Sequence, residues 1–125
     1  MQTFEFIHDG KTHNVDLTNG LIIDVEDAYG APLEGILVRK NGKAAFLIKA
    51  MMAIYVGILN NLAEKTADYS LRTSMAELRK SADFNYSSQE VQSNCAFFYK
   101  AVLDQEAEWN KIALPDAKKS KKKPK

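Results

Sequence analysis

The chain has 125 residues, 46% of them apolar and 26% charged, with one cysteine. This composition is typical of one globular domain and excludes a largely disordered chain, while the lone cysteine excludes an intramolecular disulfide. The formal net charge is +1, but without the six lysines of the last eight positions it is −5. We therefore expect a single acidic globular domain over residues 1–114 and a disordered basic tail over residues 115–125. The tail lysines are Lys118, Lys119, Lys121, Lys122, Lys123 and Lys125.

The first thirty residues predict a β-hairpin and a short helix. Apolar and polar side chains alternate over residues 4–8, Asp9-Gly10 is a turn signal, and residues 12–17 return as a second strand. Either Thr18 or the following asparagine then caps a helix that stops at Gly30. These short elements begin the fold.

The segment Ala44–Leu59, AAFLIKAMMAIYVGIL, is apolar on nearly every side. Its 16 residues, interrupted by Lys49, fall short of the roughly 20 that a membrane-spanning helix needs. We expect a buried central helix, enclosed by its own chain or by a partner. A short helical turn over residues 33–37 and the turn signal Asn41-Gly42 are predicted to precede it.

The second half of the chain predicts two amphipathic helices. Apolar residues recur at steps of three and four from Ala67 to Ala82. Ser87 with Glu90 forms a capping-box signature for the last helix. Its core face would carry Val91, Cys95, Phe98, Val102, Gln105, Trp109 and Ile112. The predicted fold class is α+β, mostly helical: a short N-terminal β-hairpin followed by four to five helices around an apolar central helix.

No residue pattern in the chain points to catalysis, a metal or a cofactor. His8 and His13 are too few ligands for a metal site, and the acidic segment 24–27 is typical of a solvated helix face. Cys95 lies on an apolar face, where a thiol lacks the activating base that a nucleophile needs. We therefore expect a protein that is not an enzyme and binds no cofactor.

The aromatic residues of the last helix suggest a docking surface. Phe97 and Tyr99 each lie about 100° from Phe98, which belongs to the core face. One interpretation is that a broad apolar face buries all of them. The alternative is that Tyr69, Phe97 and Tyr99 stay partly exposed and bind an apolar partner. These three residues are the candidate partner-binding residues.

Three segments together carry a family likeness: FEFIHDGKTHNVDLT, then LIIDVEDAYGAPLEGIL, then AAFLIKAMMAIYVGIL. Over roughly residues 3–62 the chain resembles the tail assembly chaperones of long-tailed bacteriophages and gene transfer agents. Later in the chain, Ser87–Val91 stands where such proteins commonly carry an "LT.EEV" signature. The resemblance implies a small, helical, non-catalytic protein of the host cytoplasm, absent from the mature virion. Its implied partners are the tape measure protein, which it keeps soluble, and the tail tube subunit.

Other functions remain open from the sequence. The lysine tail could serve a small cytoplasmic regulatory or nucleic-acid-associated protein. Against nucleic acid, the rest of the chain shows neither a basic face nor alternating aromatic and basic residues. Self-association is a further open partnership, and no membrane partner is expected because the apolar segment 44–59 is too short to span a bilayer. The N-terminus shows no signal-peptide pattern, so we expect a cytoplasmic protein.

Overall fold

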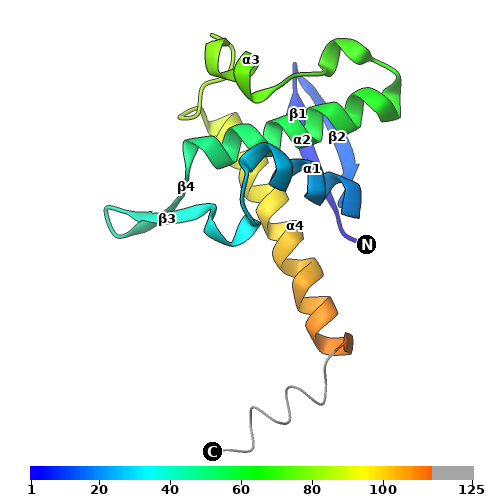
Figure 1. Cartoon of the computed structure of the whole chain (residues 1–125), viewed down its shortest axis with the longest axis vertical. Coiled ribbons are helices and arrows are strands. Elements are labelled where there is room, and N and C mark those ends of the chain that lie inside the picture. The colour runs from blue at the N-terminus through cyan, green and yellow to red at the C-terminus, as the bar shows by residue number, and fades with distance from the viewer. Residues whose placement is uncertain (114–125) are drawn as a thin grey trace, which may run out of the picture.

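Two β-hairpins and four α-helices make up the computed structural model of the chain (Figure 1). It describes residues 1–113, without the side chains of Lys40 and residues 109–113, so the lysine tail lies outside the described residues. The elements are β1 (Thr3–His8), β2 (Lys11–Asp16), α1 (Asn19–Tyr29), the 3-10 turn η1 (Leu33–Gly35), β3 (Leu37–Lys40), β4 (Lys43–Phe46), α2 (Ile48–Thr66), the 3-10 turn η2 (Tyr69–Leu71), α3 (Met75–Lys80) and α4 (Gln89–Ala113). The predicted α+β, mostly helical class with an N-terminal hairpin is confirmed.

The N-terminal hairpin forms as the turn signal predicts. Asp9 and Gly10 have φ of 52° and 75°, the left-handed conformation that two-residue hairpin turns require. The antiparallel register places Phe4 opposite Val15, and both side chains are buried. One face of the hairpin therefore packs into the core.

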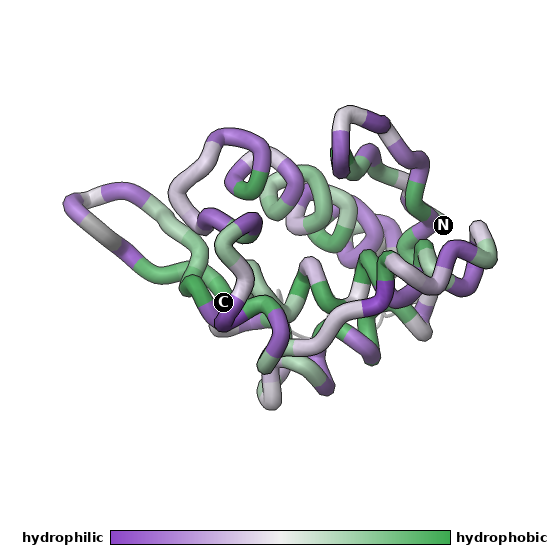
Figure 2. The backbone as a smooth tube through the Cα atoms, turned by 90° about the horizontal axis from the view of Figure 1, so that it is seen from above, coloured by the Kyte–Doolittle hydropathy of each residue, from purple (hydrophilic) through white to green (hydrophobic). Residues whose placement is uncertain are grey.

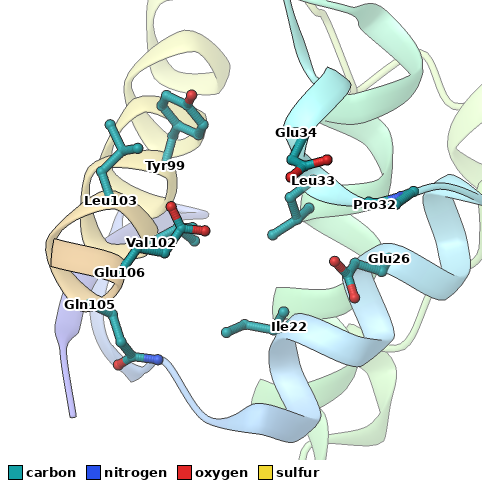
Figure 3. Close-up of a pocket in the computed structure, with 10 residues that line it drawn as sticks. All are labelled: Ile22, Glu26, Pro32, Leu33, Glu34, Tyr99, Val102, Leu103, Gln105 and Glu106. Atoms are coloured by element: carbon teal, nitrogen blue, oxygen red, sulfur yellow. The ribbon is translucent and has the colours of Figure 1, made fainter. Parts of the chain in front are cut away.

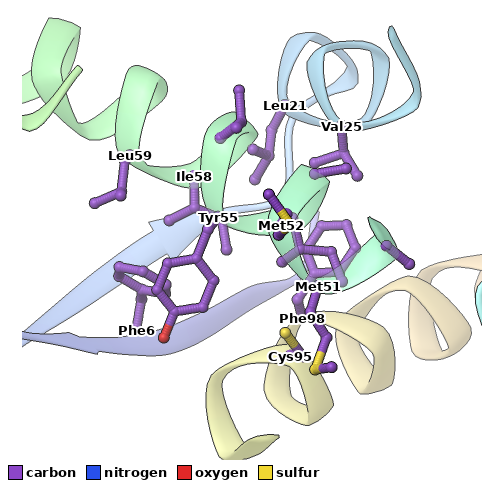
Figure 4. Packing of buried hydrophobic residues seen from close by; sticks show 14 of the residues in the cluster. Phe6, Leu21, Val25, Met51, Met52, Tyr55, Ile58, Leu59, Cys95 and Phe98 are labelled. Carbon is purple, nitrogen blue, oxygen red and sulfur yellow. The ribbon is translucent and has the colours of Figure 1, made fainter. Parts of the chain in front are cut away.

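Helix α1 begins and ends at the residues that its caps predict. The Thr18 hydroxyl accepts a hydrogen bond from the Leu21 N–H at 3.1 Å. Gly30 closes the helix with φ of 80°, and its N–H donates to the Glu26 carbonyl at 2.7 Å. Leu21 and Val25, one turn apart, are buried and face α2 (Figure 4).

Residues 37–46 form a second hairpin. The predicted helical turn over residues 33–37 is therefore too long, and the prediction that the central helix starts at residue 44 is wrong. Only Leu33–Gly35 form a helical turn. Asn41 and Gly42 have φ of 53° and 77°, and this type of turn matches the twist of two paired strands. The Leu47 N–H donates to the Ile36 carbonyl at 2.9 Å, so α2 starts only at Ile48.

The helix predicted over residues 67–82 is also wrong in extent. Helix α2 ends where Ala67 turns left-handed, with φ of 57°. The Asn60 side chain then holds the backbone of Thr73, accepting from its N–H at 2.9 Å and donating to its carbonyl at 3.1 Å. Ser74 restarts the helix by accepting from the Glu77 N–H, and α3 spans only Met75–Lys80.

Helix α4 begins one residue later than the capping box predicts. It is the Ser88 hydroxyl, not that of Ser87, which accepts from the Val91 N–H, at 3.1 Å. The predicted core face is buried through Cys95, Phe98 and Val102. The side chains of the last two predicted members of this face, at positions 109 and 112, lie outside the described residues.

Helix α2 runs through the middle of the molecule, and its residues Ala50–Leu59 are buried on every side. The hairpin β1–β2, α1 and α4 surround it, and apolar side chains from all of them meet there (Figure 4). The chain itself therefore encloses the apolar helix. Among the described residues, no helix has the length and apolar character to cross a membrane.

Candidate protein-binding groove

An open groove of about 710 Å³ separates α1 and η1 from α4 (Figure 3). Apolar side chains form its two walls. Ile22 and Leu33 project from α1 and η1, and Tyr99, Val102 and Leu103 face them from α4. Leu103 is 46% exposed, so apolar surface continues from the core to solvent here.

Local contacts fix both walls. The Tyr29 hydroxyl donates to the Gly35 carbonyl at 3.2 Å and so ties η1 to the end of α1. On the opposite wall, the Tyr99 ring packs edge-to-face on Phe46, with the ring centroids 5.8 Å apart. Each side of the groove is therefore held in place by a contact within the fold.

Three carboxylates lie along the groove: Glu26, Glu34 and Glu106 (Figure 3). Within the described part of the chain, none of the three forms an ion pair. Apolar walls below free carboxylates favour a partner segment with an apolar face flanked by basic side chains. An amphipathic helix is the usual segment of this kind.

The structure does not bring the three candidate partner-binding residues together. Tyr99 is half-buried and lines the groove. Phe97 is 39% exposed, but it lies about 200° from Tyr99 around α4 and faces away from the groove. Tyr69 belongs to η2 and is 56% exposed, with the Arg72 guanidinium 5.0 Å from the centre of its ring.

The α1 and η1 wall of the groove was missed by the sequence analysis. Ile22 and Leu33 lie far from α4 in sequence, and a helical spacing pattern reports only one helix at a time. Leu103 offered a weak signal, because it is apolar but does not belong to the predicted core face, although it follows Val102 of that face directly.

Cys95 and Tyr55 are buried in the core, and burial shifts the pKa of both side chains. Burial raises the pKa of the Cys95 thiol to about 12, and the pKa of Tyr55 also rises to about 12, chiefly through burial. His8 and His13 lie on the N-terminal hairpin. Among the described residues, no three histidine, cysteine or acidic side chains could together hold a metal ion.

None of the protein families, curated proteins and solved structures compared with the chain matches it. The class of the molecule is therefore given by its own architecture: a small α+β protein with a central apolar helix and an open groove that has apolar walls and is bordered by carboxylates.

Proposed function

We propose that the protein is a tail assembly chaperone of a bacteriophage or gene transfer agent, and that it keeps the tape measure protein soluble by holding a helical segment of it in the groove. The open apolar groove between α1, η1 and α4 is the observation that carries this proposal. The resemblance over residues 3–62 supplies the identity of the partner. In this function the protein acts in the host cytoplasm, recruits tail tube subunits and is absent from the mature virion.

The groove suits such a client for two physical reasons. Long apolar helices aggregate unless their apolar face is covered, and the groove offers the apolar walls of Tyr99, Val102 and Leu103 for that purpose. Charged residues make up 26% of the chain, and charged side chains on the surface favour solubility of the complex.

Two variants of α4 assign the client to one side of the helix. Leu103→Asp places a carboxylate in the groove, and Phe97→Asp places one on the opposite side, at a position of similar exposure. Each variant is co-expressed with the candidate tape measure protein of its own genome, and the soluble fraction of that client is measured. Circular dichroism of each purified variant checks its fold.

We expect Leu103→Asp to lose the client and Phe97→Asp to keep it, because an unpaired charge at an apolar interface is strongly unfavourable. Loss in Phe97→Asp alone would move the docking surface to the other face of α4. A tape measure protein that stays insoluble with the wild-type chain would contradict the proposed function itself.

A further inference from the structure

The second hairpin, β3 with β4 (Leu37–Phe46, hereafter the arm), projects from the body of the molecule (Figures 1 and 2). Leu37 and Phe46 at its base are half-buried, whereas Val38 is 40% exposed. Each strand has four residues and pairs only with the other. Since a lone two-stranded hairpin is at best marginally stable in water, the outer part of the arm lacks a packing partner within one copy.

The charges of the arm and of the groove are opposite in sign. Arg39 and Lys43 are exposed on the arm, and its sequence, LVRKNGKAAF, contains no acidic residue. The groove carries three carboxylates, and Glu34 and Glu106 among them are exposed. The arm thus combines the two properties that the groove selects, an exposed apolar side chain and flanking basic groups.

The arm leaves the body at the edge of the groove. Phe46, at the arm's base, packs on Tyr99 of the groove wall, and Glu34 precedes the first arm strand by only three residues. The arm points outward (Figure 1), and none of its residues is among those that line the groove of its own copy. In a two-fold symmetric dimer, an arm of one copy that lies over the groove of the other is matched by the reverse contact, because an isologous contact is repeated twice.

We infer that two copies of this chain exchange arms, each arm occupying the groove of the other copy. Val38 then covers apolar wall, and Arg39 and Lys43 lie beside the groove carboxylates. The inferred dimer depends only on the surfaces of the arm and the groove, not on the proposed function. Its role, to cover the groove until a client displaces the arm, rests on the proposed function.

Charge reversal on each surface tests the exchange in the full chain. The arm variant is Arg39→Glu with Lys43→Glu, and the groove variant is Glu34→Lys with Glu106→Lys. A control, Lys11→Glu with Lys80→Glu, changes as many charges on exposed sites of β2 and α3. Analytical ultracentrifugation over a wide range of protein concentration gives the dimer dissociation constant, and circular dichroism checks each fold.

We expect wild type and control to dimerise, and the arm and groove variants each to have a dissociation constant raised by roughly tenfold or more. An equimolar mixture of the two variants should form a heterodimer, because in the mixed dimer both arm and groove pairs again have opposite charges. Added salt should weaken the wild-type dimer.

Three results would overturn the inference: a wild-type chain that stays monomeric at every concentration, a dimer that the arm variant leaves unchanged, or two weakened variants that do not associate when mixed. None of these results bears on client solubility in co-expression, so the exchange and the chaperone function fail independently.

Discussion

A single buried asparagine joins three elements of the fold. Asn94 on α4 is fully buried, and its amide donates to the Ile7 carbonyl and to the Tyr55 hydroxyl, each at 2.8 Å. Its side-chain oxygen accepts from the Ile7 N–H at 2.9 Å. The side chain thus gives the outer edge of β1 the hydrogen bonds that a further strand would give, and ties it to α2 and α4.

We expect Asn94→Ala to lower the free energy of unfolding by about 2 to 4 kcal/mol, because the N–H and carbonyl of Ile7 then lose their hydrogen-bond partner. Urea denaturation followed by circular dichroism measures this change. Ser93→Ala, at the neighbouring half-buried position, is the control and should stay within about 0.5 kcal/mol of wild type. An equally small effect at Asn94 would show that water replaces the amide.

The buried thiol of Cys95 should react only after the chain unfolds. Burial raises its pKa from 9.0 to about 12, so very little thiolate forms in the folded protein at pH 8. Alkylation by iodoacetamide, followed by mass spectrometry, should be slow in buffer and fast in urea. Rapid, complete labelling of the folded chain would contradict the burial of this residue.

The same raised pKa gives the sign of a pH effect. Above pH 9 the thiol ionises in the unfolded chain but stays protonated in the folded one, so stability falls as pH rises from 9 toward 12. The Cys95→Ala variant lacks this group. We expect its free energy of unfolding to fall less steeply over that range than that of wild type, and parallel curves would contradict the assignment.

At the scale of elements, a glycine of α2, Gly57, lies in close contact with α1. A Cβ atom added to Gly57 would lie 2.5 Å from Val25 Cγ2 and 3.2 Å from the Val25 backbone nitrogen. We expect Gly57→Ala to destabilise the protein despite the better helix propensity of alanine, because α1 must shift outward. The thermal midpoint measures the change.

Gly20→Ala is the matched control for this contact. Gly20 also lies in a helix, but there an added Cβ would come no closer than 3.9 Å to the nearest atom, Thr18 Oγ1. We expect it to raise the free energy of unfolding by about 0.5 to 1 kcal/mol through propensity alone. Equal shifts in both variants would show that α1 and α2 can separate freely.

Elements with a local signal were predictable from the sequence, and those decided by distant contacts were not. Thr18 caps the start of α1 and Gly30 caps its end, and both residues are recognisable from the sequence alone. By contrast, the apolar steps from Ala67 to Ala82 suit one helix, yet Asn60 on α2 holds the backbone of Thr73 outside any helix, and the segment is divided there. Such a contact overrides local propensity and leaves no periodic trace.

At the scale of the whole molecule, aromatic contacts unite the N-terminal hairpin with both long helices. Phe4 packs edge-to-face on Phe98 of α4 at 5.7 Å, and Phe6 packs on Tyr55 of α2 at 5.1 Å. The first strand and the last helix therefore depend on each other. The groove likewise exists only in the assembled fold, which is why the sequence identified Tyr99 but not the facing wall.

This arrangement predicts two classes of amide hydrogen exchange. Amides of β1, of α2 and of the first half of α4 should exchange only through global unfolding, because they share one core. Those of the arm should exchange through local opening, since β3 and β4 bond only to each other. Hydrogen exchange with mass spectrometry, at a dilution at which the chain is monomeric, measures both classes.

Hydrogen exchange measured at several protein concentrations distinguishes protection of the arm within one copy from protection through exchange of arms between two copies. Raising the protein concentration should slow exchange in the arm and leave the core class unchanged, because only the arm gains a partner in the dimer. The arm variant Arg39→Glu with Lys43→Glu should show no such slowing. If the arm in the monomer is already as protected as α2, one copy packs the arm fully, and this result would contradict the argument that the arm needs a second copy as its packing partner.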